Sequence, residues 1–416
     1  MTIEITPSTV NGQVQAPPSK SVAQRAIAIA SIATGTSEIF HVGKSDDVQS
    51  AIKVCRALGA DVEEKGEKLI IKGGIQTPSL PLNCGESGLG IRMFSAIAAI
   101  LYEPVTLTGE GSLTERPMKM IEESLQAAGV QCETQNGLVP VVVKGPFKGG
   151  TVKIDGSASS QVLTGLLIAA PCALSPVTFH VSDLKSRPYV DITTGMIHDF
   201  GVVVENTDYE QFVVPAPQKY ISKSYSVEGD WSGAAFFLVA GAIAGEVMVT
   251  NLNFQSKQAD KAILTAIKNS GAELLVEQDR VSVKKSKLKA FRFDATHCPD
   301  LFPPLVVLAA ACDGISQIRG VSRLRAKESD RATSLQQEFG KLGLYISLEG
   351  DNMLIKGNSL NGGKVFSHND HRIAMACAVA GLTANKPVFI DKAEAVNKSY
   401  PEFFEDLKKI TVKNEK

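Results

Sequence analysis

One pattern occurs six times along the 416 residues, and this repeat constrains the fold more than any other feature of the sequence. Each copy has a polar loop followed by a segment rich in small apolar residues. Equivalent positions in successive loops lie 67 to 73 residues apart. A spacing this regular indicates one supersecondary unit copied along the chain. The six loops begin at Ala16, Asn83, Asp155, Glu228, His297 and His368.

Each copy predicts two helices of different character. The first is apolar almost all round, as in residues 234–244, and such a helix must be buried on all sides. A short β-branched segment such as 103–109 follows and predicts a strand. The second helix, as in residues 46–58, is amphipathic and ends before a glycine. A strand pair such as 272–285 comes after it. The predicted unit is therefore β-α-β-α-β-β.

The repeat also predicts the domain organisation. A chain of 416 residues is too long for one ordinary core, so we expect an α+β protein of two domains with three units each. We place the crossings near Pro18–Ser19 and near Glu228. A lower domain then comprises residues 1–18 and 228–416, and an upper domain comprises residues 19–227. The sixth unit should take a strand from the N-terminus, because the chain ends soon after it.

Composition excludes several classes of function. The net charge of −1 argues against a nucleic-acid-binding protein, which usually carries a basic excess. The seven cysteines form no CxxC pair, which is typical of reduced thiols and predicts a cytoplasmic protein. The N-terminus has no apolar signal segment, and the apolar runs are too short to span a membrane. His368 and His371 lack further ligands nearby in sequence, so we expect no metal.

Cations and hydrogen-bond donors gather at the predicted helix starts. Free backbone N–H groups and the helix dipole make such a start an anion site. One arginine alone is more often a surface ion pair. Because equivalent loops in five or six copies carry cations or donors, we expect them to converge on one cleft that binds small substrates bearing phosphates and carboxylates. These residues include Lys20, Ser21, Arg25, Arg92, Arg116 (expected to open its helix), Ser159, Ser160, Gln161, Arg187, Tyr189, Arg323, Arg325, Lys327, Arg331, Arg372 and Lys398.

Two carboxylates stand among these cations. Glu328 is flanked by Lys327 and Arg331, and Asp300 lies in the fifth loop. A carboxylate in a cationic pocket stays ionised at neutral pH and can act as a base. Glu328 could equally form an ion pair with Arg331 three residues later, and Asp300 could equally cap a helix. The residues alone leave both alternatives open.

Taken in order, the loops resemble the enolpyruvyl transferase family. The motifs are PSKS with Arg25, LTERPM, DGSASSQ, SRPYVDIT, RAKESDR and NDHRIAMA, and the resemblance covers nearly the whole chain. It implies two domains of three βαβαββ units around buried helices, an inside-out α/β barrel. It also implies transfer of the enolpyruvyl group of phosphoenolpyruvate to the 5-hydroxyl of shikimate 3-phosphate by addition and elimination, with release of phosphate. This reaction belongs to the biosynthesis of chorismate and aromatic amino acids. No organic cofactor is implied, and we expect a monomer whose partners are its substrates.

The resemblance implies roles for single residues. Asp300 would take the proton of the attacking hydroxyl, while Glu328 and Lys20 would handle the proton at the methylene carbon. The phosphoenolpyruvate site would comprise Lys20, Gly88, Arg116, Gln161, Arg331, Arg372 and Lys398. The shikimate 3-phosphate site would comprise Lys20, Ser21, Arg25, Ser159, Ser160, Gln161, Ser186, Tyr189, Asp300 and Lys327.

The second loop departs from the family pattern. It has Glu86, Ser87, Gly88 and Leu89 where the family usually has Asn, Ser or Ala, Gly and Thr. A carboxylate at position 86 is expected to repel phosphoenolpyruvate unless Arg92 or another cation offsets its charge. The affinity for phosphoenolpyruvate and the response to glyphosate therefore stay open.

Two alternatives remain. A related enzyme transfers the same group to UDP-N-acetylglucosamine, but it typically has Lys-Asn in the first loop and a cysteine in a mobile loop. Here Ser21 follows Lys20, and LTERPM contains no cysteine. The other alternative is a non-catalytic binding protein, which Glu86 would favour. The presence of Asp300, Glu328 and Lys20 together argues against it, because a binding protein needs no bases.

Overall fold

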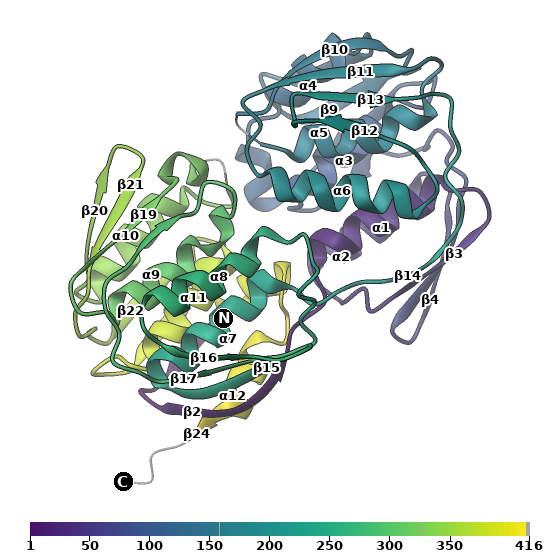
Figure 1. Ribbon diagram of the computed structural model, residues 1–416. Coiled ribbons are helices and arrows are strands. Elements are labelled where there is room, and N and C mark those ends of the chain that lie inside the picture. The colour runs from purple at the N-terminus through teal and green to yellow at the C-terminus, as the bar shows by residue number, and fades with distance from the viewer. Residues whose placement is uncertain (158, 326, 413–416) are drawn as a thin grey trace. The chain divides into compact units, whose positions relative to one another are not determined.

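The computed structural model describes residues 1–157, 159–325 and 327–412, so Ala158 and Ala326 of the loop motifs lie outside the described residues. The chain divides into two compact units (Figure 1). Unit 1 comprises Met1–Pro17 and Glu228–Lys416, and unit 2 comprises Pro18–Val227. Pro18 thus falls in unit 2, one residue away from the expected boundary. None of the described helices is long and apolar enough to span a membrane.

Unit 2 contains three copies of the repeat. Its inner helices are α1 (Lys20–Ile32), α3 (Gly88–Ala98) and α5 (Gln161–Ala169), and its outer helices are α2 (Asp46–Ala57), α4 (Lys119–Ala127) and α6 (Arg187–Asp199). Short 3-10 helices are η1 (Gly111–Glu115) and η2 (Ala170–Cys172). The strands are β3 (Thr36–Phe40), β4 (Asp61–Lys65), β5 (Lys68–Lys72), β6 (Leu82–Asn83), β7 (Val105–Thr108), β8 (Gln131–Gln135), β9 (Leu138–Lys144), β10 (Gly150–Asp155), β11 (Val177–Ser182), β12 (Glu205–Thr207), β13 (Gln211–Val214) and β14 (Ser224–Ser226).

Unit 1 contains the other three copies. Its inner helices are α7 (Trp231–Ala244), α9 (Phe302–Ala310) and α11 (His371–Gly381), and its outer helices are α8 (Ile263–Asn269), α10 (Arg331–Lys341) and α12 (Phe403–Ile410). The 3-10 helices are η3 (Ala259–Ala262), η4 (Pro299–Leu301), η5 (Val321–Leu324) and η6 (Ala393–Lys398). The strands are β1 (Thr2–Ile5), β2 (Thr9–Gln15), β15 (Gly245–Thr250), β16 (Glu273–Val276), β17 (Val281–Lys284), β18 (Arg292–Asp294), β19 (Ile315–Arg319), β20 (Tyr345–Glu349), β21 (Asn352–Lys356), β22 (Gly363–Phe366), β23 (Val388–Asp391) and β24 (Thr411–Val412).

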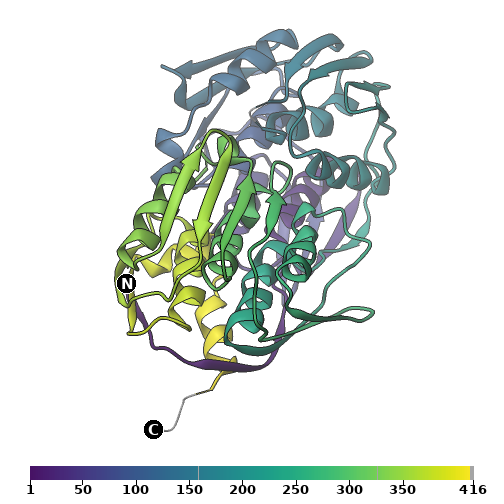
Figure 2. The ribbon, with the colours of Figure 1, turned by 60° about the vertical axis from the view of Figure 1, so that its left-hand side comes forward.

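Each copy forms one open sheet on the outside of its unit. In the second copy β6 runs parallel to β7, and the β8–β9 hairpin adds antiparallel to β7. The copies that begin with β10 and β18 have the same order. Figure 2 shows the green sheet of the fifth copy covering one side of unit 1, with helices behind it. These sheets remain separate. The predicted β-α-β-α-β-β unit is confirmed in the first five copies, and the sixth has a three-stranded sheet of order β1-β23-β22.

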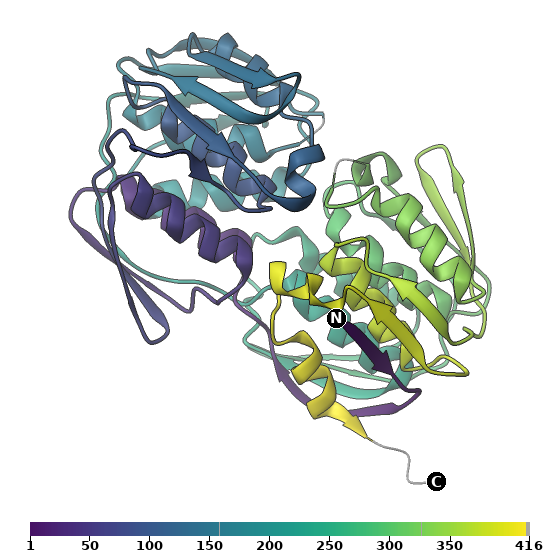
Figure 3. The ribbon, with the colours of Figure 1, turned by 180° about the vertical axis from the view of Figure 1, so that it is seen from behind.

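At the two places where the chain crosses between the units, a strand pairs with a strand that is distant in the sequence. β2 precedes α1 in the chain, yet it pairs in parallel with β15 of unit 1. β14 precedes α7, yet it pairs in parallel with β3 of unit 2. β1 pairs antiparallel with β23 and completes the sixth copy, as expected from the short C-terminus (Figure 3).

The six inner helices form the cores of the two units. Every residue of α7 and of α3 is buried, which agrees with their apolar circumference. Small residues let these helices approach closely. A Cβ atom at Gly165 in α5 would lie 2.7 Å from the carbonyl oxygen of Arg92 in α3, so only glycine fits there. The helix starts, where the candidate site residues lie, are therefore fixed by close packing of the inner helices.

Candidate active site

Lys20 is the first residue of α1, and it pairs with a carboxylate that was not among the predicted site residues. Its Nζ lies 2.7 Å from Oδ2 of Asp47 in the first turn of α2. The two side chains are 16% and 7% exposed, so the pair is largely shielded from water. A signal was present in the sequence, because an acidic residue in the first turn of a helix is favoured by the dipole.

Arg25 joins three helices of unit 2 in the interior. Its Nε donates to Thr193 Oγ1 of α6 at 2.9 Å, and its Nη2 donates to Thr164 Oγ1 of α5 at 3.3 Å. Its Nη1 donates to the hydroxyl and the carbonyl oxygen of Ser21, and Nη2 also reaches the carbonyl oxygen of Tyr189. These acceptors carry no net charge, and burial lowers the pKa of Arg25 to about 10. A bound anion near Ser21 would compensate this buried cation.

Arg92 connects the starts of α3 and α5. Its Nη1 donates to the carbonyl oxygen of Gly88 at 2.9 Å and to Gln161 Oε1 at 3.1 Å. Its Nη2 donates to the carbonyl oxygen of Pro117 at 3.3 Å. These contacts place Gln161, the first residue of α5, beside the glycine at the first position of α3.

Arg116 lies against Gly88, but it does not open a helix. It follows η1 in an extended conformation, and α4 begins only at Lys119, so the expectation of a helix start at Arg116 is wrong. A Cβ atom at position 88 would lie 2.3 Å from Nη1 of Arg116. Glycine is thus required for the arginine to approach the start of α3.

Three further predicted serines, besides Ser21, also lie at helix starts of unit 2. Ser159 Oγ accepts a hydrogen bond from the backbone N–H of Gln161 at 3.2 Å. Ser160 and Ser186 are buried at the N-cap positions of α5 and α6, and Ser186 has a left-handed backbone with φ of 55°. This conformation is uncommon for residues other than glycine. The few residues that adopt it are concentrated at functional sites.

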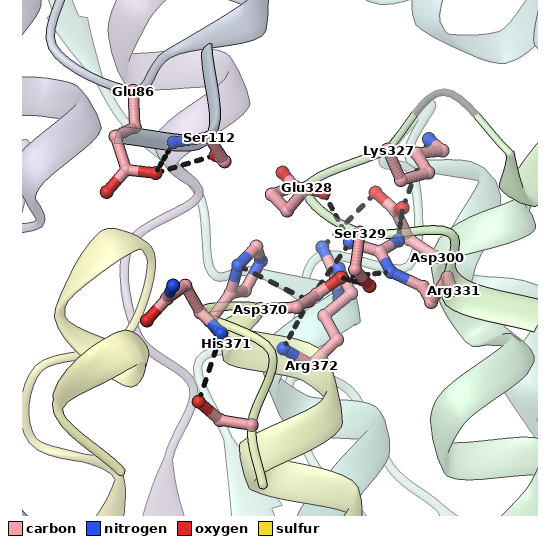
Figure 4. A network of polar contacts seen from close by, with 12 residues as sticks. Glu86, Ser112, Asp300, Lys327, Glu328, Ser329, Arg331, Asp370, His371 and Arg372 are labelled. Carbon is pink, nitrogen blue, oxygen red and sulfur yellow. Dashed lines mark hydrogen bonds and ion pairs between the residues drawn. The ribbon is translucent and has the colours of Figure 1, made fainter. Parts of the chain in front are cut away.

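In unit 1, Arg331 is the centre of a network of carboxylates (Figure 4). It is the first residue of α10, and its side chain is 1% exposed. Its Nη1 lies 2.8 Å from Asp300, its Nη2 lies 2.5 Å from Glu328 and its Nε lies 2.9 Å from Asp370. Asp370 is the N-cap of α11, where it accepts a hydrogen bond from the backbone N–H of Arg372. The structure therefore joins the loops of the fifth and sixth copies.

Asp300 is surrounded by three cations. Besides Arg331, Lys327 Nζ lies 3.3 Å and Arg372 Nη2 lies 3.2 Å from its carboxylate. Burial acts to raise the pKa of Asp300, but the charges of Arg372, Lys327 and Arg331 outweigh it and hold the pKa well below its usual range. The N-cap of η4 is Cys298, so the interpretation of Asp300 as a helix cap is wrong.

Glu328 forms the ion pair with Arg331 that the sequence left as an alternative. The pair joins a loop to a helix, because α10 begins only at Arg331. Ser329 next to it donates a hydrogen bond to Asp370 Oδ2 at 3.1 Å. This ion pair does not exclude a chemical role for the same carboxylate.

Arg372 has hydrogen-bond donors that the described residues do not use. Its side chain is 5% exposed, and only Nη2 contacts Asp300. Its Nε and Nη1 are buried and form no hydrogen bond with any of the described residues. Buried donors of this kind are costly unless an acceptor satisfies them. Lys398, at the end of η6, is buried in the same unit.

The structure thus groups the predicted residues within each unit. In unit 2, Arg25, Arg92 and the contact of Ser87 Oγ with Gln24 Oε1 connect the starts of α1, α3 and α5. In unit 1, Arg331 and Asp300 connect the starts of α9, α10 and α11. Thr164 and Thr193 were missed because only tertiary packing brings them to the site, and Asp47 was missed although its position in the first turn of α2 gave a signal. In the part of the chain that the structure describes, no group of three or more His, Cys, Asp or Glu is placed to hold a metal.

Two units of three βαβαββ copies, with cations and carboxylates at the helix starts, agree with the class of protein indicated by the motifs. The model of the family "EPSP synthase (3-phosphoshikimate 1-carboxyvinyltransferase)" matches residues 5–407. The chain is 38% identical to the 3-phosphoshikimate 1-carboxyvinyltransferase of Clostridium novyi over 98% of this chain and 97% of the relative. It is 39% identical to that of Methanosarcina mazei over 99% of this chain and 98% of the relative.

The fold agrees with solved structures as well. The EPSP synthase from Acinetobacter baumannii superposes with a TM-score of 0.84 at 28% identity, covering 99% of this chain and 98% of that chain. The chain therefore belongs to the EPSP synthase family. The predicted family and the predicted fold class are both confirmed.

Proposed function

We propose that this chain transfers the enolpyruvyl group of phosphoenolpyruvate to the 5-hydroxyl of shikimate 3-phosphate and releases phosphate. Membership of the family over residues 5–407 supports this activity. Both substrates are polyanions, and they suit the cations at the helix starts of the two units. The reaction needs no external group, because phosphoenolpyruvate supplies both the transferred group and the leaving phosphate.

The observation that carries the proposal is the network around Arg331, in which Asp300 and Glu328 are both held by cations. In the addition step, the 5-hydroxyl oxygen bonds to C2 of phosphoenolpyruvate, its proton goes to Asp300, and the methylene carbon C3 gains a proton from Glu328 or Lys20. In the elimination step, C3 returns a proton to Glu328 or Lys20, the bond from C2 to the phosphate oxygen breaks, and the leaving phosphate takes up the hydroxyl proton held by Asp300. Two positioned acid–base groups meet these requirements.

The ion pairs of Asp300 keep its carboxylate ionised before the substrates bind. While Lys327, Arg331 and Arg372 face Asp300, its depressed pKa makes it a weak base. We propose that substrate phosphate or carboxylate groups take over the hydrogen bonds of Arg372 and Lys327. The pKa of Asp300 would then rise, and it could accept the hydroxyl proton.

We assign the substrates to the residues of both units as the family motifs imply. Burial of Arg25 beside Ser21 supports an anion site there, and the unsatisfied donors of Arg372 support another. The proposed shikimate 3-phosphate contacts are Lys20, Ser21, Arg25, Ser159, Ser160, Gln161, Ser186, Tyr189, Asp300 and Lys327. The proposed phosphoenolpyruvate contacts are Lys20, Gly88, Arg116, Gln161, Arg331, Arg372 and Lys398.

A substitution of Arg25 tests the proposed shikimate 3-phosphate site. Arg25→Met retains an unbranched side chain but removes the buried charge, and it should raise the KM for shikimate 3-phosphate by at least about tenfold. The KM for phosphoenolpyruvate should change much less. A larger effect on phosphoenolpyruvate would contradict the assignment.

We also propose that the chain works in the cytoplasm as a monomer. The seven cysteines are free in the described residues, which suits a reducing compartment. Light scattering during size-exclusion chromatography should give a mass near 44.3 kDa. A mass of twice this value would overturn the monomer.

A further inference from the structure

Glu86 departs from the family pattern in the second loop, and its carboxylate accepts hydrogen bonds from another segment of the same unit. It lies between β6 and α3 in unit 2. Its Oε2 accepts hydrogen bonds from the backbone N–H of Ser112 at 2.9 Å and from Ser112 Oγ at 2.6 Å (Figure 4). Two donors on one carboxylate oxygen form a strong, directed contact, because the acceptor is ionised.

The segments on either side of this contact are joined at further points. The backbone N–H of Glu110 donates to the carbonyl oxygen of Gly85 at 2.8 Å, and Asn83 Nδ2 donates to Glu110 Oε1 at 2.6 Å. Gly111 has a φ of +50°, and a Cβ atom there would lie 2.5 Å from Cδ of Glu86. Glycine is thus the residue that admits the Glu86 side chain.

This contact leads directly to Arg116. Ser112 is the second residue of η1, which ends at Glu115, and the backbone N–H of Arg116 donates to the carbonyl oxygen of Leu113 at 3.2 Å. The guanidinium of Arg116 then contacts Gly88, only two residues after Glu86. Covalent chain and contacts together form a closed ring from Glu86 through Ser112 and η1 to Arg116 and back through Gly88.

We propose that Glu86 is a positioning residue that sets Arg116 for the phosphorylated, carboxylated substrate, and that it does not act as a repulsive charge. This inference rests on the proposed function, in which Arg116 contacts phosphoenolpyruvate. The Glu86 side chain reaches Ser112, and its charge is directed at two hydrogen-bond donors. The glutamate at position 86, although it departs from the family pattern, therefore supports η1 and the Arg116 that follows it.

Substitutions of Glu86 separate the two possible effects. In Glu86→Gln the amide oxygen can still accept both Ser112 donors, but the charge is lost. In Glu86→Ala both the charge and the contact are lost. A repulsive Glu86 requires the KM for phosphoenolpyruvate to fall in both variants. If Glu86 positions Arg116, the KM for phosphoenolpyruvate should stay within about twofold of wild type in Glu86→Gln and rise by about tenfold in Glu86→Ala. The rise corresponds to the loss of hydrogen bonds to a charged group.

A control variant tests for a general effect of charge. Glu115→Gln removes an equal charge at an exposed position of η1, the helix that Glu86 contacts, and it should leave the KM for phosphoenolpyruvate unchanged. The KM for shikimate 3-phosphate should stay near wild type in all three variants. A rise of both KM values together in Glu86→Ala would indicate general loosening of the fold and would overturn the proposal.

A double-mutant cycle with Arg116→Ala isolates the link between the two residues. If Glu86 acts through Arg116, Glu86→Ala should change the KM for phosphoenolpyruvate little once Arg116 is absent. A full, additive rise in that background would overturn the proposal.

Failure of the proposed function gives a different result. If wild type itself releases no phosphate, the proposed function fails. If wild type is active and Glu86→Ala is unaffected, only the positioning role is overturned.

Discussion

At the scale of single residues, Glu328 offers the sharpest test of the chemistry. Glu328→Gln retains the shape of the side chain and an acceptor for Arg331, but it cannot carry a proton to or from the methylene carbon. We expect kcat to fall by at least about a hundredfold, while both KM values change by less than about threefold. Steady-state kinetics with each substrate varied would measure this. Equal losses in kcat and in affinity would contradict the proton-transfer role.

Asp300 makes the stability of unit 1 depend on pH. Its pKa in the folded state is depressed, so its stabilising contribution is present above the unfolded value of about 3.9 and is lost as the pH falls through the folded value. Asp300→Asn lacks this contribution and leaves three cations short of a partner, which should cost about 3 kcal/mol near neutral pH. The free energies of unfolding of the two proteins should therefore converge below about pH 4.

Urea unfolding of wild type and of Asp300→Asn across this pH range would measure the convergence. A difference that stays constant from neutral to acidic pH would show that Asp300 does not have a depressed pKa. Glu338 also has a lowered pKa, although burial opposes it, through Lys341, His368 and the backbone N–H of Phe366. Its contribution is shared by both proteins and cancels in the comparison.

The sequence predicted many of these residues, because cations and carboxylates stood at equivalent places in the repeats. It could not predict their pairing. Whether Glu328 was a base or an ion-pair partner depended on the start of α10, and the neutral acceptors around Arg25 come from α5 and α6, more than a hundred residues away. Such contacts are properties of tertiary packing and leave no local signal.

At the scale of elements, the close contact of α3 with α5 holds the starts of both helices in place. Gly165→Ala would put a Cβ atom 2.7 Å from the carbonyl oxygen of Arg92 and 2.9 Å from Cα of Met93. The helices would have to separate, and we expect a loss of about 1–3 kcal/mol in the free energy of unfolding. Chemical denaturation measures this change, and kinetics should show a raised KM, because Gln161 and Gly88 lie at these helix starts.

Gly195 in α6 provides the matched control. It is also a helical glycine, but it is exposed, and a Cβ atom there would have no atom within 4 Å. Gly195→Ala should stabilise the protein by about 0.4–1 kcal/mol, because alanine restricts the unfolded chain and favours the helix. A gain of stability in Gly165→Ala as well would contradict the packing described for α3 and α5.

Helix boundaries show where sequence patterns were misleading. We placed a helix start at Arg116, but this residue precedes Pro117, and the residue before a proline is disfavoured in the helical conformation. The observed φ and ψ of −83° and 138° agree with that restriction. Pro117 was therefore a signal in the sequence against a helix start at Arg116. The preceding helix η1 had no strong sequence pattern of its own.

At the scale of the whole molecule, the sixfold repeat predicted two groups of three units, and the strand pairings support this architecture. The use of β1 in the sixth copy followed from the short C-terminus. The pairing of β2 with β15 and of β14 with β3 could not be predicted from local patterns, because each strand precedes a helix of the other unit in the chain. Periodicity reveals the copies, but only long-range pairing decides which strand completes which sheet.

The most direct test of the account is phosphate release from phosphoenolpyruvate by the purified chain, with shikimate 3-phosphate or UDP-N-acetylglucosamine as acceptor. We expect rapid release with shikimate 3-phosphate, none above background with UDP-N-acetylglucosamine, and a strongly reduced rate in Glu328→Gln. Release with UDP-N-acetylglucosamine alone would contradict the proposed acceptor. Tight binding of both proposed substrates without any release would show that the cations bind anions but that the chain does not catalyse the transfer.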